Sequence, residues 1–167
     1  MSARSLTFAQ RWFQPVPAAR LALLRVAVGA YAVVYLVVRF SNLVSYAGFE
    51  ANQFEPVGPV AALSEPVPDL LVYLLALAAV ASGLAFTLGW RFAVSGPIFA
   101  VLLLWVISYR NSFGQVFHTE NLMVLAVLIV ALAPAADAFS LDERCDARGR
   151  GSTTAIAMAG LSAWSAW

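Results

Sequence analysis

The residues best suited to chemistry gather in one stretch, where Tyr109-Arg110-Asn111 is followed by His118-Thr119-Glu120. An imidazole beside a carboxylate can move protons, because histidine titrates near about pH 6.5. Arg110 adds a cation that could bind an anion next to that pair. His-x-Glu also opens the zinc deaminase signature, but the Pro-Cys-x-x-Cys that completes it is absent. We therefore take His118, Glu120 and Arg110 as the candidate catalytic residues.

The same residues also admit a purely structural interpretation. Thr119 can cap the start of a helix, and Glu120 then lies at the positive end of that helix. His118 is the only histidine, so haem ligation by two histidines of this chain is excluded. His118, Glu120 and Asp69 could together bind a metal, but this set does not identify a metal site. We predict no metal and leave the cofactor unknown.

Arg25 is the other unusual polar residue, because it lies inside an apolar stretch of the sequence. A charge inside the bilayer costs about 2.5–3.5 kcal/mol on insertion scales, and less where the side chain can reach the headgroups. Asp137, after the last apolar stretch on the same side, is its best candidate partner in the protein. We interpret Arg25 and Asp137 as structural intramembrane polar residues, and we expect Arg25 to reach the inner headgroups or to pair within the protein. The alternative is a functional role for Arg25, as an anchor for an anionic ligand or as the partner of an acid in a buried site.

The composition indicates what kind of protein positions these residues. The chain has 167 residues, of which 62% are hydrophobic and 11% charged, whereas soluble domains have about 45–50% and 25%. A soluble domain of this size leaves roughly 30% of its unfolded-chain surface exposed and cannot hide so much apolar surface. The composition therefore indicates a membrane protein. The ten basic residues are all arginines, so a mechanism that needs a lysine amine is excluded. Cys145 is the single cysteine, so an intrachain disulfide is excluded as well.

Four apolar stretches approach the length of about 20 residues that a helix needs to cross a bilayer core. They cover residues 18–38, 70–88, 92–109 and 121–136, the last of which is short unless it includes the residues around His118. Small residues such as Ala79 and Gly83 favour close packing of the second stretch and a central place for it. The predicted fold class is all-α, a polytopic transmembrane helical bundle of four spans with an N-terminal interfacial helix and a possible partial fifth segment.

The placement of arginine predicts the orientation, because basic residues favour the cytoplasmic side. Arginines precede the first span, separate the second and third at Arg91, and follow the fourth, whereas the long outer loop 41–69 carries four acidic residues and no arginine. Arg110 is the exception. We expect a protein of the inner cell membrane with both termini in the cytoplasm. Its parts would be a cytoplasmic interfacial segment (1–17), a transmembrane domain (18–142), and a cytoplasmic linker with an apolar C-terminal segment (143–167).

Several short motifs resemble those of DoxX-like and HTTM membrane proteins, the latter being related to vitamin-K-dependent gamma-carboxylase. Leu21-x-x-x-Arg25-x-x-x-Gly29 resembles the start of such proteins. Residues 54–58, Phe-Glu-Pro-Val-Gly, are similar to their Phe-x-Pro-Val-Gly segment, and residues 110–142 are similar to their Arg-Asn…Leu-Leu…Pro…Ser-Leu-Asp block. The resemblance covers residues 18–142 and implies a multi-span helical bundle with a site near the outer face.

The resemblance does not imply carboxylase chemistry, because the gamma-carboxylase uses a lysine base and this chain has no lysine. Related proteins usually continue with further helices after the Ser-Leu-Asp turn, so we expect a shortened member of the group or a fragment. We expect an accessory or non-catalytic membrane component, whose partners are the lipid bilayer and potentially other membrane subunits. Whether the protein is an enzyme is left open.

The alternative function is a membrane oxidoreductase subunit or an enzyme that acts on a quinone or lipid-like substrate. Five tryptophans and eleven phenylalanines could line a pocket for such a substrate. Aromatic residues also form belts at membrane interfaces, so composition does not decide between the two functions. With a net charge of +1 there is no field to attract a polyanion, and nucleic acid is not an expected partner.

Overall fold

The computed structural model describes residues 18–114, 118–133, 135 and 139–142. Every regular element in these ranges is a helix, which confirms the all-α prediction for the described residues. The predicted interfacial segment 1–17 and the predicted C-terminal segment 143–167 lie outside the described residues.

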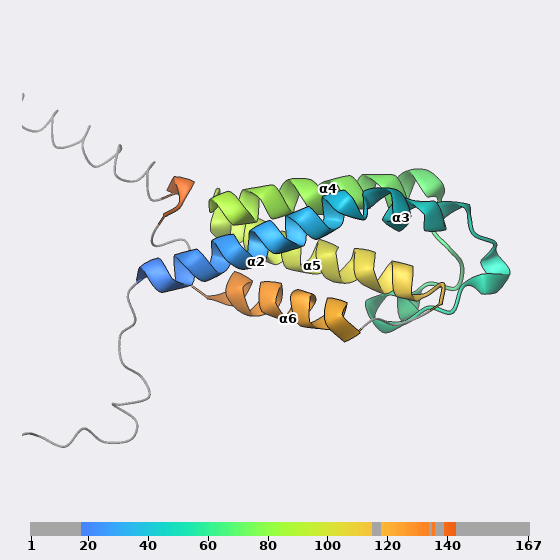
Figure 1. The fold of residues 1–167 in the computed structure, drawn as a ribbon. Coiled ribbons are helices and arrows are strands. Elements are labelled where there is room, and N and C mark those ends of the chain that lie inside the picture. The colour runs from blue at the N-terminus through green and yellow to red at the C-terminus, as the bar shows by residue number, and fades with distance from the viewer. Residues whose placement is uncertain (1–17, 115–117, 134, 136–138, 143–167) are drawn as a thin grey trace, which may run out of the picture.

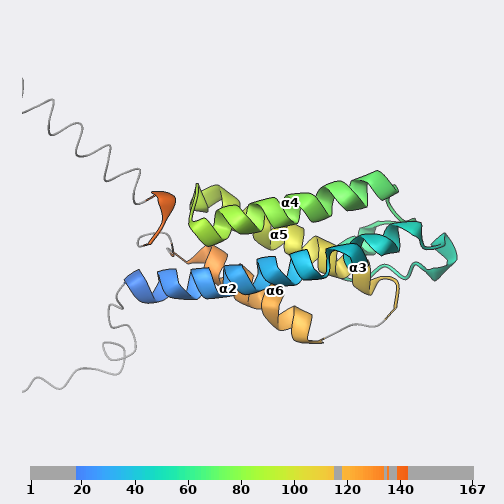
Figure 2. The same cartoon turned by 45° about the horizontal axis from the view of Figure 1, so that its top comes forward.

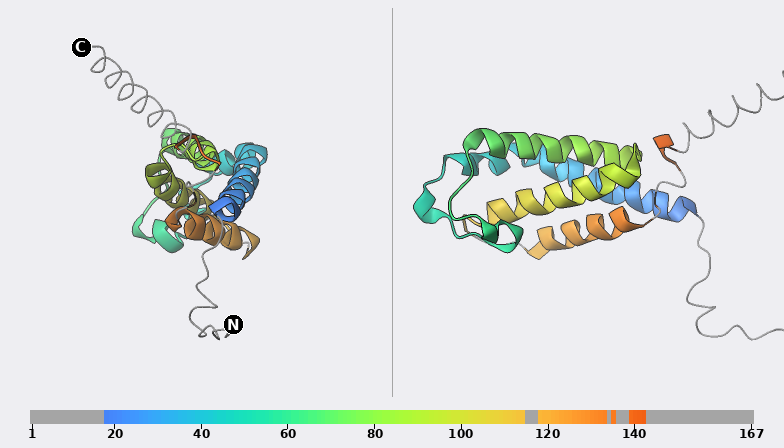
Figure 3. Two further views of the ribbon diagram at one scale, coloured as in Figure 1. Left: turned by 90° about the vertical axis from the view of Figure 1, so that its left-hand side faces the viewer. Right: turned by 180° about the vertical axis from the view of Figure 1, so that it is seen from behind.

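Four helices form the bundle: α2 (Ala18–Val38), α4 (Asp69–Leu88), α5 (Phe92–Asn111) and α6 (His118–Leu132). They pack in a ring in which α2 and α5 each contact both α4 and α6 (Figures 1 and 3). The first three helices lie within two residues of their predicted bounds. The fourth includes His118 and ends at Leu132, earlier than predicted.

Three of these helices, α2, α4 and α5, are long and apolar enough to cross a membrane, with a mean hydropathy of 2.2, 2.2 and 2.0. The apolar helix α6 has 15 residues and so a length of about 22 Å, less than the ~30 Å of a hydrocarbon core. Large apolar side chains cover the outside of the bundle; Val38 is 76%, Leu70 70% and Leu132 79% exposed. Such a surface suits lipid rather than water, and the chain is a membrane-embedded, multi-pass protein.

Three helices approach one another closely at Gly83 of α4. A Cβ atom there would lie 2.8 Å from the ring of Phe99 in α5 and 2.9 Å from the side chain of Val33 in α2, so no larger residue fits without displacement. The predicted close packing around Ala79 and Gly83 is therefore confirmed. The predicted central place of α4 is not confirmed. In the 18-residue apolar window of each helix, 56% of α5 is buried but only 28% of α4.

The connection between α2 and α4, predicted as a loop, contains the short helix α3 (Phe40–Ser45) and three 3-10 turns, η1 (Tyr46–Gly48), η2 (Ala51–Gln53) and η3 (Gly58–Ala62) (Figure 2). It folds over the end of α5, where Ser112 binds it twice. The Glu55 amide donates to the Ser112 carbonyl at 2.7 Å, and the Val57 amide donates to the Ser112 hydroxyl at 3.1 Å. We call this end of the bundle the loop end.

The opposite end, which holds the turn between α4 and α5, is organised around Arg25. This side chain is fully buried, so it does not extend to the headgroups as a snorkelling arginine would. Its Nη1 donates to the Ala135 carbonyl at 2.5 Å and its Nη2 to the Phe139 carbonyl at 2.6 Å. Arg25 thus satisfies carbonyl oxygens that follow the end of α6, which would otherwise be costly to bury. We call this end the turn end.

Asp142 completes the turn end by capping α5 from a distant part of the sequence. Its two carboxylate oxygens accept hydrogen bonds from the amides of Arg91 and Phe92, each at 2.8 Å. Its own amide donates to the carbonyl of Gly89 at 3.2 Å. A carboxylate at a helix N-terminus is favoured by the exposed amides and by the helix dipole. Asp137, the predicted partner of Arg25, lies outside the described residues.

The buried position of Arg25 predicts a large loss of stability on substitution. Arg25→Met removes two charge-assisted hydrogen bonds and leaves two carbonyl groups unsatisfied, so we expect the free energy of unfolding to fall by about 3 kcal/mol. Thermal unfolding of the detergent-solubilised protein would measure this. The matched control is Arg20→Met, because Arg20 is exposed on the same helix. Equal melting temperatures for the two variants would contradict the structural role of Arg25.

Candidate functional site

The loop end contains a buried ion pair between Arg110, in the last turn of α5, and Glu120, in the first turn of α6. Nη1 of Arg110 contacts Oε1 of Glu120, and only 6% and 7% of the two side chains are exposed. The pair joins the two helices across residues 112–117. Burial of either charge alone would cost several kcal/mol, on the order of the ion desolvation penalty, so each residue depends on the other.

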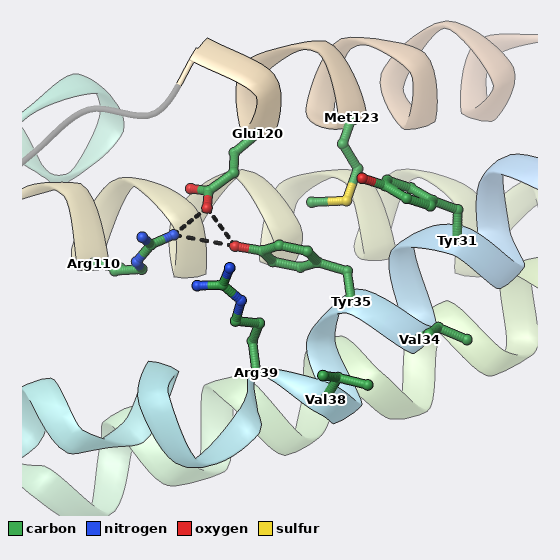
Figure 4. Close-up of a pocket in the computed structure, with 8 residues that line it drawn as sticks. All are labelled: Tyr31, Val34, Tyr35, Val38, Arg39, Arg110, Glu120 and Met123. Atoms are coloured by element: carbon green, nitrogen blue, oxygen red, sulfur yellow. Dashed lines mark hydrogen bonds and ion pairs between the residues drawn. The ribbon is translucent and has the colours of Figure 1, made fainter.

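Tyr35 of α2 adds a third helix to this pair (Figure 4). Its hydroxyl donates a hydrogen bond to Oε1 of Glu120, and it accepts one from Nη1 of Arg110 at 3.1 Å. Among these three groups, one carboxylate oxygen of Glu120 accepts hydrogen bonds from both a guanidinium and a phenol. We call Tyr35, Arg110 and Glu120 the loop-end triad.

The geometry of the triad favours a fixed charge pair over a free base. Oε1 of Glu120 already accepts from Tyr35 and Arg110, and Oε2 is buried with no hydrogen-bond partner among the described residues. A proton-transfer base must lie within hydrogen-bond reach of the proton that it takes. One carboxylate oxygen is thus engaged by two donors and the other is buried, whereas Tyr35 and the two arginines, Arg39 and Arg110, line an open space.

This open space is a cavity of about 430 Å³ between α2 and α6 (Figure 4). The loop-end triad lines it together with the exposed Arg39, whose guanidinium lies 5.8 Å from the centre of the Tyr35 ring. Val34, Val38 and Met123 supply its apolar wall, and Tyr31 also lines it. A volume of this size lies within the usual range of about 300–1,000 Å³ for a small-molecule site.

A second cavity, of about 450 Å³, adjoins the first and shares Tyr31 and Met123 with it. Its other lining residues are small or apolar: Ala27 and Val28 of α2, and Leu122 and Ala126 of α6. The two cavities follow the same pair of helices from the loop end toward the middle of the bundle. Together they form what we call the α2–α6 groove, which is charged at one end and apolar along the rest.

Of the predicted site residues, the structure brings Arg110 and Glu120 together. His118 is the first residue of α6, but its side chain lies outside what the structure describes. Arg25 belongs to the turn end, at the other end of the bundle. Asp69 is exposed at the start of α4 and does not line the groove. No group of three His, Cys, Asp or Glu side chains that could hold a metal occurs in the part searched, the described residues.

Helix α2 contributes residues to this site that were not among the predicted site residues. Tyr31, Tyr35 and Arg39 follow one another at intervals of four residues, and that spacing places them on one face of a helix. Three residues able to form hydrogen bonds on one face of a membrane helix are a signal that the sequence does contain. Arg39 also lies at the loop end, so it is a second exception, beside Arg110, to the predicted placement of arginines.

The loop-end triad predicts a specific stability effect for Glu120→Gln. The neutral amide leaves the buried guanidinium of Arg110 without its counter-charge, so we expect the free energy of unfolding to fall by about 3–5 kcal/mol. Thermal unfolding in detergent measures the effect, with the exposed Glu65→Gln as the control. Adding Arg110→Met to Glu120→Gln should recover part of the loss, because no unpaired charge then remains. A Glu120→Gln variant as stable as Glu65→Gln would contradict the buried pair.

No protein-family model matches the chain, and neither a curated protein nor a solved structure matches it.

Proposed function

We propose that this chain is a non-catalytic, accessory component of the inner cell membrane that holds a lipid-like amphiphile in the α2–α6 groove. The observation that carries the proposal is the shape and polarity of that groove. One end is lined by Arg39 and the loop-end triad, and the remainder is lined by apolar side chains. An amphiphile presents the same division between a polar head group and an apolar tail, and the groove lies between two helices that lipid surrounds.

The proposal includes four membrane spans with both termini in the cytoplasm, and a place in the DoxX/HTTM-like group on the strength of the short motifs. The three long apolar helices support the spanning architecture. Arg20 and Arg91 lie at the turn end, whereas Glu50, Glu55 and Glu65 lie at the loop end, which supports a cytoplasmic turn end. The loop end also holds Arg39 and Arg110, but the charge of Arg110 is neutralised by Glu120. Among the described arginines, only Arg39 therefore counts against this orientation.

A quinone-binding oxidoreductase subunit is the second candidate, and Tyr35 is the observation that favours it. Its phenol lies beside the groove and shares a hydrogen bond with a carboxylate, an arrangement that can pass a proton to a bound quinone. The engaged state of Glu120 Oε1 supports the non-catalytic proposal instead. Quinone and lipid both need the apolar part of the groove.

The orientation can be tested with the single native cysteine and one engineered cysteine. In intact cells, a membrane-impermeant maleimide should label Ser64→Cys in a Cys145→Ser background, because residue 64 is exposed in the outer connection. The native Cys145 should react only after the membrane is opened. Labelling of both positions in intact cells would mean that α6 does not cross the membrane, and labelling of Cys145 alone would mean the opposite orientation.

The binding function can be tested by filling the apolar part of the groove. Ala126→Phe places a ring in the second cavity, so we expect at least about a tenfold loss of co-purifying amphiphile, since the lost apolar contact and the steric overlap both oppose binding. Mass spectrometry of the purified protein would count the bound molecules. The matched control, Ala81→Phe, adds the same ring at an exposed position of α4. Equal amounts of bound amphiphile in the two variants would overturn the proposal.

A further inference from the structure

We infer that the amphiphile held in the α2–α6 groove is an anionic phospholipid, and that Arg39 binds its phosphate while an acyl chain lies toward Ala126. The inference rests on the proposed function, since it names the ligand class of the same groove. It goes further by assigning the head-group charge and the residue that selects it.

The first support is the charge balance of the polar end. Two arginines and one glutamate line the cavity, namely Arg39, Arg110 and Glu120. Because Glu120 forms an ion pair with Arg110, the positive charge of Arg39 remains without a carboxylate partner among the described residues. A single negative charge on the ligand would complete the neutralisation. A phosphodiester supplies one such charge, and a guanidinium matches its oxygen geometry.

The second support is the position of Arg39 relative to Tyr35. Arg39 directly follows α2, and its amide donates to the Tyr35 carbonyl at 2.9 Å, so the two residues are held one turn apart. The guanidinium lies over the Tyr35 ring at 5.8 Å. This contact directs the cation toward the cavity (Figure 4). The phenol of Tyr35 lies within the same cavity, so the head group would meet a cation and a hydroxyl together.

The third support is the apolar path that leads away from this cation. From Met123 the groove continues along Ala27, Val28, Leu122 and Ala126, and no charged side chain lines that part. Small alanines on both helices leave room for a chain between them, and the flexible thioether of Met123 can adapt to it. A free phosphate ion would make no use of this path. A neutral quinone would use the path but would leave Arg39 without a counter-charge.

The test compares two lipids with identical acyl chains, phosphatidylglycerol and phosphatidylcholine. The full-length protein is stripped of lipid in detergent and titrated with each lipid, and native mass spectrometry counts the bound molecules. We expect one molecule of phosphatidylglycerol to bind about tenfold more tightly than phosphatidylcholine. Both lipids carry the phosphate, but the choline cation of phosphatidylcholine offsets its charge beside Arg39, whereas phosphatidylglycerol keeps a net negative charge. Arg39→Gln should abolish this preference, whereas Arg39→Lys should keep most of it.

The controls separate this inference from the proposed function. Arg20→Gln removes an exposed arginine from the other end of α2 and should leave the preference unchanged. Equal binding of both lipids, or a preference that survives Arg39→Gln, would overturn the anionic assignment while Ala126→Phe still reports on the groove. Binding of neither lipid, together with no effect of Ala126→Phe, would instead overturn the proposed function. Tighter binding of ubiquinone than of phosphatidylglycerol, unchanged in Arg39→Gln, would also overturn the anionic assignment.

Discussion

A guanidinium inside an apolar bundle must find its hydrogen-bond acceptors within the protein, and the architecture of this chain depends on that constraint at the loop end. Arg110 lies in the last turn of α5 and Glu120 in the first turn of α6, so their ion pair fixes how the two helices are placed relative to each other. Tyr35 extends the same contact to α2. Water cannot solvate these groups in lipid, so loss of one partner exposes the other to the full cost of burial.

The turn end solves the same problem with different acceptors. Among the described residues, Arg25 donates to the backbone carbonyls of Ala135 and Phe139. Asp142 accepts hydrogen bonds with its two carboxylate oxygens from the amides that begin α5. The chain after α6 therefore returns to the turn between α4 and α5 through these hydrogen bonds. Because both ends are fixed by polar contacts, the middle of the bundle can be almost entirely apolar and closely packed, as at Gly83.

Hydropathy and the spacing of small residues predict most of the fold, because a membrane helix must be apolar over its whole length and glycine marks close approaches. They do not predict which helix is most buried, since mean hydropathy is similar for α4 and α5. The sequence also places Arg110 and Glu120 near one another in a single stretch. It does not identify Asp142 as the cap of α5, because residues 91 and 142 come together only through the tertiary fold.

The contribution of Tyr31, Tyr35 and Arg39 explains why the polar end of the groove is open rather than filled. Their spacing of four residues places them along one face of α2, opposite the first turns of α6. Tyr35 is drawn into the triad by Glu120, whereas Arg39 lies one turn further and stays exposed over the Tyr35 ring. Tyr35 thus joins α2 to the buried ion pair, and Arg39, four residues further on the same face, lies beside the cavity. The residue that would bind the ligand and the residue that holds the three helices together lie on one helix face. A negative charge bound at Arg39 would therefore lie next to Tyr35, whose hydrogen bonds join α2 to α5 and α6.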